Sequence, residues 1–323
     1  MTRPHAPRTR VSTYLSDWMP TNDVTRQPVA GYFAGGYDGT ASGFVSRIDK
    51  MAFPSDTLTV NADSLSVAGY QLRGFGNSGV AGYACGVGYG PNTEQTTVNK
   101  ITYATDTRST TTALGTVRRL GSGFSNYGVA GYYAGGYDGG NYLSSVEKYA
   151  FPADTRTTTT ALSGTRFNFG SFTNNGVAGY SIAGLYAGAY SAHIEKMVFP
   201  ADTVSVLSAT LTISLASNIG FADFGVAGYS LGGNIGTYYT NVDRISLVND
   251  TKTNITSLSV ATTSMMQGFQ NTAVAGYAGG GADGSSTFNT VKKMGFPTET
   301  ISNTTNLTGN NQLGAGFANE GTF

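Results

Sequence analysis

The chain has 323 residues, of which 19 are basic, 19 are acidic and 40% are hydrophobic. This length and apolar content can bury a sizeable core, whereas the sparse and balanced charge argues against nucleic acid or an anionic membrane as partner. No apolar run is long enough for a secretory signal or a membrane span, so we expect a soluble chain without membrane insertion. The single cysteine, Cys85, excludes an intrachain disulfide and a cysteine-based zinc cluster.

Residues 1–28 form a segment of separate composition. They include four arginines, two aspartates, four prolines and the only tryptophan. A short stretch with Tyr14, Leu15, Trp18 and Met19 is too apolar for a plain tail and too short to fold alone. We therefore expect an N-terminal arm that docks onto a partner through these four side chains.

Residues 29–323 contain six similar units, each beginning with the motif Val-Ala-Gly-Tyr, near residues 29, 80, 129, 177, 226 and 274. The starts lie 48 to 51 residues apart, a period typical of propeller blades or solenoid repeats. Two further landmarks keep this period. One is a basic residue: Lys50, Lys100, Lys148, Lys196, Arg244 and Lys293. The other is an acidic residue before a threonine: Asp56, Asp106, Asp154, Asp202, Asp250 and Glu299.

The third unit illustrates the strands that we expect in every unit. Its apolar and β-branched runs at 129–137, 145–151, 156–162 and 167–172 are separated by turn residues and show no helical period. Four antiparallel strands per unit are typical of a propeller blade. Three-residue hairpin loops, most of them ending in a glycine at a position that needs positive φ, join each fourth strand to the next motif strand. The sequence predicts an all-β, six-bladed propeller.

The two ends of the repeat region predict how the ring closes. Only an irregular segment precedes the first motif strand, whereas residues 312–323 match the strand that precedes the motif elsewhere. We expect the C-terminal strand to pair with the first motif strand and complete blade one, which removes an open sheet edge.

The repeated residues favour a structural interpretation. Glycine and alanine on a motif strand near the axis would leave room where six sheets converge, and each motif tyrosine would fill space between adjacent blades. The basic residues could form a ring for phosphate or nucleic acid, or a repeated ion pair with the acid six residues later. We favour the ion pair, because an acid accompanies every base, and we expect no nucleic-acid partner.

A glycine doublet ends the motif strand in four units, starting at Gly35, Gly135, Gly232 and Gly279. With the loop and the strand of the type SSVEKYAFPADT that follow, this pattern resembles the kelch repeat over residues 29–323. The units lack the tryptophan usual in kelch repeats, and units two and four break the doublet at Val87 and Leu185. The Thr- and Gly-rich, tryptophan-free style is similar to kelch-like virion proteins of tailed phages of marine bacteria and cyanobacteria. The resemblance implies a virion structural protein.

Catalytic chemistry finds little support in the sequence. A kelch-type copper radical oxidase needs two histidines that converge at the axis. This chain has two histidines, but His5 lies in the N-terminal arm and only His193 lies in the repeat region. Neither a sialidase Asp-box nor a phosphate-binding loop that leads into a helix occurs. A pair of carboxylates for glycoside hydrolysis has no diagnostic sequence spacing, so a hydrolase stays an alternative. We expect no enzymatic activity, no cofactor and no metal.

The loops between the first two strands of each unit differ most among the units. Antiparallel alternation predicts that all six lie on one face of the ring. There they would present Tyr37, Tyr89, Tyr137, Tyr142, Tyr186, Tyr190, Tyr238 and Tyr239 among small polar residues. Tyrosine with Ser, Asn and Gly suits the recognition of glycans or proteins, although tyrosines that only cover loop backbone would give the same pattern.

The sequence therefore predicts a non-enzymatic phage virion protein, either a tail-fibre or tail-tip component or a capsid-surface decoration. Residues 1–28 would anchor it to other virion proteins, and the propeller would contact a host-surface glycan or protein. Two alternatives stay open. One is a cellular glycan- or protein-binding propeller at the cell surface or outside the cell, and the other is a surface-polysaccharide hydrolase.

Overall fold

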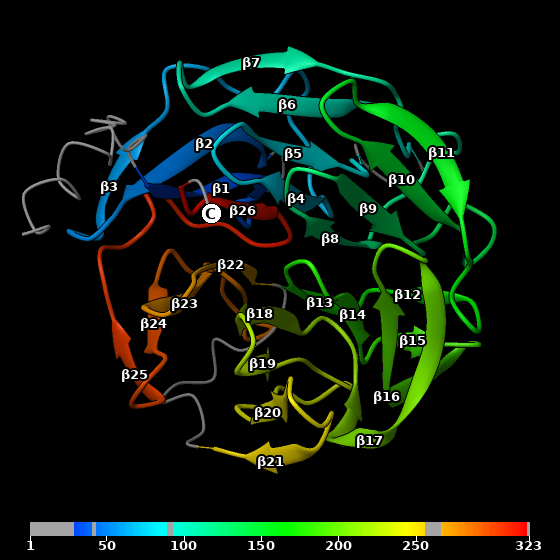
Figure 1. Ribbon diagram of the computed structural model, residues 1–323. Coiled ribbons are helices and arrows are strands. Elements are labelled where there is room, and N and C mark those ends of the chain that lie inside the picture. Colours follow the sequence, from blue (N-terminus) through cyan, green and yellow to red (C-terminus); the bar gives the residue numbers. More distant parts are fainter. Residues whose placement is uncertain (1–28, 41–42, 89–92, 256–265, 322–323) are drawn as a thin grey trace, which may run out of the picture.

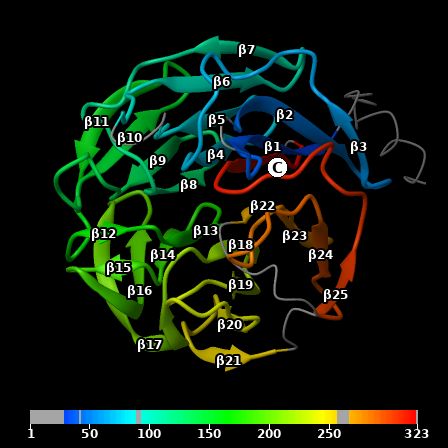
Figure 2. The ribbon, with the colours of Figure 1, turned by 180° about the vertical axis from the view of Figure 1, so that it is seen from behind.

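A computed structural model describes residues 29–40, 43–88, 93–255 and 266–321. Six small antiparallel sheets stand around a central axis, as both views of the ribbon show (Figures 1 and 2). This arrangement confirms the six-bladed propeller. The arm at residues 1–28, with Tyr14, Leu15, Trp18 and Met19, lies outside the described residues, as does Tyr89.

Each blade has four main strands, which run in order from the axis outward. Blade 1 is β26 (Ala315–Asn319), β1 (Ala30–Tyr37), β2 (Phe44–Ala52) and β3 (Thr57–Val60). Blade 2 is β4 (Arg73–Asn77), β5 (Ala81–Cys85), β6 (Val98–Thr102) and β7 (Thr107–Thr110). Blade 3 is β8 (Ser122–Asn126), β9 (Ala130–Ala134), β10 (Val146–Ala150) and β11 (Thr155–Thr159).

The other three blades repeat this order. Blade 4 is β13 (Gly170–Asn174), β14 (Ala178–Ile182), β16 (Ala189–Val198) and β17 (Thr203–Leu215), and the short strands β12 (Arg166–Phe167) and β15 (Leu185–Tyr186) extend it. Blade 5 is β18 (Ile219–Asp223), β19 (Ala227–Leu231), β20 (Val242–Ser246) and β21 (Lys252–Asn254). Blade 6 is β22 (Gln267–Asn271), β23 (Ala275–Gly279), β24 (Val291–Gly295) and β25 (Thr300–Asn303).

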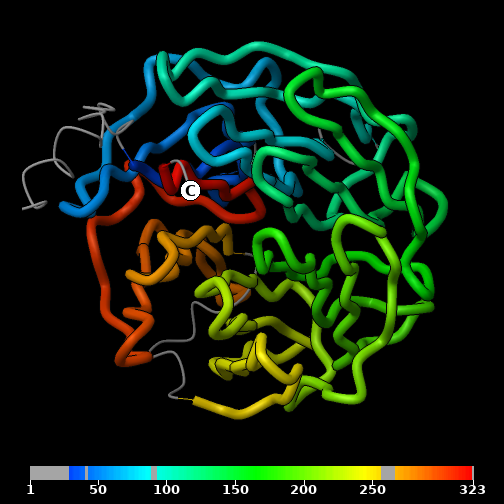
Figure 3. The backbone as a smooth tube through the Cα atoms, in the orientation of Figure 1, coloured from blue at the N-terminus to red at the C-terminus, as the bar shows by residue number. Residues whose placement is uncertain are grey.

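The repeat unit and the blade are offset by one strand. The fourth strand of each unit is the innermost strand of the next blade, and the last one, β26, pairs with β1. Figure 3 shows the resulting closure, where the red C-terminal tube runs beside the blue N-terminal one. The predicted ring closure is confirmed.

The strand boundaries predicted for the third unit differ from the observed ones by up to three residues. The strand expected at 167–172 begins instead at Gly170, because Asn168 has a φ of 56° and interrupts the extended chain. Phe167, before this break, pairs with Leu185 in the small extension of blade 4.

The hairpins between the two innermost strands have the expected backbone. The third loop residue has positive φ in all five, at Gly79, Gly128, Gly176, Gly225 and Ala273, and the corresponding Gly321 after β26 in blade 1 has it as well. Their tips meet at the axis, as shown by the contact of Tyr127 of blade 3 with Glu320 of blade 1. We call this side of the ring the hairpin face.

The motif strand lies second from the axis, and its glycine does not provide the room where the six sheets converge. The innermost strands approach one another through their own glycines: a Cβ on Gly123 would lie 2.2 Å from the Gly74 carbonyl oxygen. The motif glycine instead receives a phenyl ring from the adjacent blade. A Cβ on Gly131 would lie 2.2 Å from the Phe75 ring, and the same pairing recurs in all six blades. Only glycine leaves this space.

A three-residue clasp joins each blade to the next. In blade 3, the Tyr132 hydroxyl donates to Asp202 Oδ1 at 2.8 Å, and Lys148 Nζ lies 2.7 Å from Asp202 Oδ2. Burial, followed by the hydrogen bond to Asp202, raises the pKa of Tyr132, so this hydroxyl stays a neutral donor.

The clasp recurs at every interface and confirms that the motif tyrosines fill the space between blades. The acids that receive the tyrosines of blades 1 to 6 are, in order, Asp106, Asp154, Asp202, Asp250, Glu299 and Asp56. The predicted ion pair therefore exists, but its partner six residues later in the same unit was wrong. The turn that carries each acid packs against the preceding blade, so the acid reaches the basic residue of that blade.

Candidate functional site

The loops between the second and third strands of the blades lie at the end of the ring opposite the hairpins. They connect strands at 38–43, 86–97, 135–145, 183–188, 232–241 and 280–290, and we call this side the loop face. The chain segments that lead from the outer strand of one blade into the innermost strand of the next also reach this face. Because its residues differ most from blade to blade, the loop face is the first candidate for a binding surface.

Aspartates fasten the loops of blades 1, 3 and 6. Asp38 Oδ1 accepts hydrogen bonds from the backbone N–H and the hydroxyl of Thr40. Asp138 receives the N–H groups of residues 140 and 141, and Asp283 receives those of residues 285 and 286. These backbone donors lower the pKa of Asp138 and of Asp283. The loops of blades 3 and 6 therefore hold a defined shape around ionised carboxylates.

Tyr137 and Tyr142 belong to one aromatic cluster at blade 3. Their ring centroids lie 5.6 Å apart, and Tyr142 stacks on Phe167 at 5.0 Å. The guanidinium carbon of Arg119 lies 5.3 Å from the centre of the Tyr137 ring, and the Tyr137 hydroxyl donates to the Gly139 carbonyl. Tyr137 is thus engaged with its own loop, whereas Tyr142 is exposed to 36%.

Tyr186 and Tyr190 lie at blade 4. The Tyr186 ring packs edge-on against His193 at 5.0 Å, and its hydroxyl lies 3.0 Å from the Ser163 hydroxyl. Tyr190 is exposed to 46%. His193, which a copper site would have required as a ligand, therefore packs against a tyrosine ring.

A groove opens on the loop face between blades 1 and 6, with a volume of about 530 Å³. Tyr37 lies on one side, where backbone hydrogen bonds in both directions tie it to Gln312. Tyr238, from the neighbouring blade 5, lies against Gly284, where a Cβ would come within 2.8 Å of its ring. The polar lining consists of Asp38, Thr40, Ser285, Ser286, Thr287, Asn310 and Gln312.

The structure therefore separates the predicted tyrosines into groups. It brings Tyr37 and Tyr238 to one groove and Tyr137 and Tyr142 to one cluster, while Tyr186 and Tyr190 lie at blade 4. Tyr239 is half-buried and does not line the groove. Sequence reasoning missed Asn310 and Gln312, although ring closure places the segment before the last strand beside blade 1.

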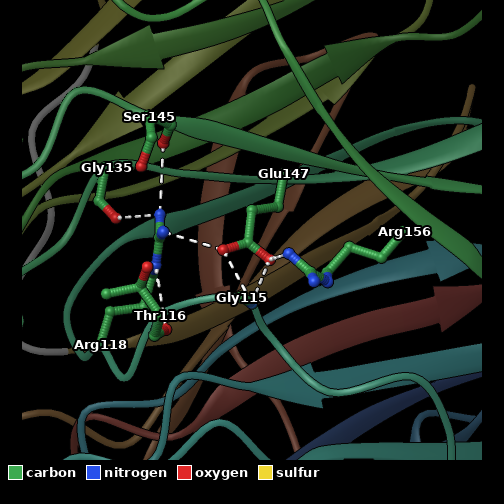
Figure 4. A network of polar contacts seen from close by, with 7 residues as sticks. All are labelled: Gly115, Thr116, Arg118, Gly135, Ser145, Glu147 and Arg156. Carbon is green, nitrogen blue, oxygen red and sulfur yellow. Dashed lines mark hydrogen bonds and ion pairs between the residues drawn. The ribbon is translucent and has the colours of Figure 1, made fainter.

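Deeply buried charges lie beneath the loop face in blade 3 (Figure 4). Glu147 accepts from Arg118 Nη2 at 2.8 Å and from the Gly115 N–H at 2.9 Å, and Arg156 Nη1 lies 3.5 Å away. The Arg118 guanidinium also donates to the carbonyls of Gly135 and Ser145. Arg118 and Glu147 are only 2% exposed, so this carboxylate fixes a connecting segment and is closed to a ligand.

The same position has related partners in other blades. Glu195 lies 3.7 Å from the buried Arg166, and Asp243 accepts the Thr212 N–H. The middle residue of each Val-Glu-Lys-type triplet is visible when the units are aligned with one another. Its role was missed because the partner lies in the segment that leads to the next blade.

The described part of the chain contains neither a metal-binding cluster nor a membrane-spanning helix. Within residues 29–40, 43–88, 93–255 and 266–321, no group of three or more His, Cys, Asp or Glu side chains is arranged to hold a metal ion. In that same part of the chain, no helix has the length and apolar character needed to cross a membrane. No protein-family model matches the sequence, and a search of curated proteins finds no match either.

Proposed function

We propose that the chain is a non-enzymatic recognition module that binds a host-surface glycan in the groove between blades 1 and 6. The groove carries this proposal because it combines two tyrosine rings with hydroxyl, amide and carboxylate side chains on a rigid ring. Its volume of about 530 Å³ lies within the range of small-molecule sites.

The chemistry of the lining fits a sugar better than an apolar or highly charged ligand. Tyrosine rings offer flat apolar surfaces, and their hydroxyls stay available for hydrogen bonds. Thr287, Asn310 and Gln312 supply neutral donors and acceptors, while Asp38 supplies a single carboxylate among the described lining side chains. The hydrogen bonds of Asp38 and Asp283 within their loops keep these polar groups in place before a ligand arrives.

We further propose that the particle carrying this module is a phage virion. Two features support the proposal: the resemblance of the repeats to kelch-like virion proteins, and the separate composition of residues 1–28. In this proposal the arm binds other virion proteins and the loop face points outward. The protein then serves as a tail-fibre or tail-tip component, or as a capsid-surface decoration.

Binding of purified host-surface oligosaccharides, measured by isothermal titration calorimetry, tests the groove. Tyr238→Ala should weaken binding about tenfold or more, the loss expected when a central aromatic contact is removed. Tyr142→Ala is the matched control, because this tyrosine is also on the loop face but outside the groove. Unchanged binding in Tyr238→Ala, or a larger loss in Tyr142→Ala, contradicts the groove assignment. Release of new reducing ends would point to a hydrolase.

Quantitative mass spectrometry of purified particles from the source lysate tests the virion assignment. A few to a few tens of copies per particle would support a tail position, and hundreds would support a capsid decoration. Absence of the chain from particles overturns the virion proposal and leaves a cellular binding protein. Deletion of residues 1–28 should abolish incorporation while the propeller still folds and binds oligosaccharide.

A further inference from the structure

The innermost strands enclose a small cavity on the axis, with a volume of about 70 Å³. Its wall is mainly backbone and small side chains, including Gly74, Gly123, Gly220, Gly268 and Gly316. A cavity of this size holds a monatomic ion with a few waters but no sugar. It is therefore separate in place and in capacity from the groove.

The hairpin face closes one end of this cavity. Tyr127, at the tip of the blade 3 hairpin, reaches across the axis, and its hydroxyl donates to Glu320 Oε1 at 2.7 Å. Gln270 Nε2 donates to the same oxygen at 2.9 Å, and the Thr272 N–H donates to Oε2 at 2.7 Å. Glu320 is thus fully engaged by protein donors at this end.

Arg73 lies at the opposite end, at the start of β4, and it lines the cavity. A strand of five residues separates it from the hairpin, about 13 Å in extended chain. Arg73 is 7% exposed, and the described hydrogen bond of its guanidinium runs from Nη1 to the Leu72 carbonyl. No carboxylate in the described part of the chain forms an ion pair with it. Burial lowers the pKa of Arg73 to about 10, so the guanidinium stays charged at neutral pH.

This arrangement departs from the rest of the protein. Two other deeply buried arginines, Arg118 and Arg166, each lie beside a glutamate, at 2.8 Å and 3.7 Å. A buried charge without a partner is costly, and a guanidinium has five N–H donors to satisfy. A counter-charge for Arg73 is therefore expected from outside the chain.

Gln267 provides a second, independent indication. It occupies in β22 the position that Arg73 occupies in β4, and both residues line the cavity. Gln267 is 1% exposed, yet among the described residues neither its Nε2 nor its Oε1 has a hydrogen-bond partner. Buried amides without partners are rare in folded proteins and call for a bound ion or water.

We infer that the axial cavity binds a small monovalent inorganic anion of halide size, held by the Arg73 guanidinium and the Gln267 amide N–H. The anion neutralises the charge of the buried arginine. It also accepts a hydrogen bond from the Gln267 amide N–H, for which the described part of the chain offers no acceptor. The position on the axis lets one ion stabilise the ring as a whole, because the cavity wall includes residues from the innermost strand of every blade.

Crystals of the full chain grown or soaked in sodium bromide test the position. We expect an anomalous-scattering peak in the axial cavity, in contact with both side chains. In solution, the midpoint of thermal unfolding should rise with chloride when chloride replaces gluconate at constant ionic strength. Water alone in the cavity and no chloride dependence would overturn the inference.

Two variants keep the test decisive. Arg73→Met and Gln267→Leu preserve side-chain bulk, and each should weaken apparent chloride affinity about tenfold or more, the effect of losing a hydrogen bond to a charge. Arg47→Met is the control, because it removes a guanidinium paired with Asp49 on β2, away from the axis. Equal chloride dependence in Arg73→Met and Arg47→Met contradicts the site. Bromide bound without any effect of chloride on stability identifies an adventitious ion only.

Discussion

The inter-blade clasp and the groove show two opposite uses of the same repeat. The clasp keeps one geometry at all six interfaces, where a tyrosine hydroxyl bonds to an acid of the next blade. The groove lies between blades 1 and 6 and is built from loop residues that differ among the units. Positions that repeat hold the ring together, and positions that diverge are available for recognition.

The largest effect is expected where a repeated glycine receives a ring. Gly131→Ala places a Cβ 2.2 Å from the Phe75 ring, so either the ring or the strand must move. We expect a loss of about 3 kcal/mol in the free energy of unfolding, measured by urea denaturation. Gly295→Ala is the control, because its Cβ would meet no atom closer than 3.4 Å. Similar losses in both variants would show that ordinary strand propensity, rather than blade packing, determines the effect.

Variants of the clasp should cost up to as much as Gly131→Ala, depending on how deeply the acid is buried. Asp202 is only 9% exposed in its side chain, whereas Asp250 at the next interface is 27% exposed. Asp202→Ala leaves Lys148 and the buried Tyr132 without their acceptor and should cost about 3 kcal/mol. Asp250→Ala should cost about 1 kcal/mol, because water replaces much of the lost contact. Urea denaturation of both variants measures the difference, and equal losses at the two interfaces would contradict a role for burial.

Glu320 should give a pH-dependent effect. Burial raises the pKa of Glu320, so folding favours its protonated form. Its stabilisation is complete below the ordinary pKa of 4.5 and is lost as the pH rises through the raised value. Glu320→Gln should therefore lose this part of the pH dependence, and the stability of the variant relative to the native chain should improve as the pH rises above about 4.5.

Tyr127→Phe sharpens this measurement. The Tyr127 hydroxyl donates to Glu320, and this hydrogen bond lowers the pKa of Glu320. Its removal should raise the pKa further and extend the pH range over which stability falls, as followed by urea denaturation at several pH values. A pH profile identical to that of the native chain would contradict the assignment to Glu320.

The smallest effect on stability should come from the groove. Tyr238→Ala removes a half-buried side chain that takes no part in the clasp, so the free energy of unfolding should change by about 0.5 kcal/mol or less. If this variant unfolds as readily as Asp202→Ala, then the groove tyrosine is part of the structural framework, and the contrast between the two regions fails.

The sequence predicted what depends on period and local backbone. Even spacing of the motif indicated six blades, and the match of residues 312–323 to other units indicated the closure by β26. Glycine at the third hairpin position predicted positive φ, which the fold imposes on Ala273 as well. These features depend on neighbours in the chain or on repetition alone.

The features that the sequence did not predict depend on contacts between units. Lys148 pairs with Asp202, which is 54 residues away, although Asp154 lies nearer in the chain. The spacing of the repeats does not show which neighbouring unit supplies the acid for a given lysine, so both Asp154 and Asp202 were consistent with the sequence pattern. Likewise, Tyr37 and Tyr238 share the groove only because the ring brings blades 1, 5 and 6 together.

The closure by β26 also has a consequence for synthesis of the chain on the ribosome. Strand β1 is made early, but the strand that covers its inner edge comes from residues 315–319 at the other end of the sequence. Until those residues leave the exit tunnel, the edge of β1 is open to pairing with other strands. A chain that ends before residue 315 thus has five complete sheets and one open strand edge, which favours aggregation.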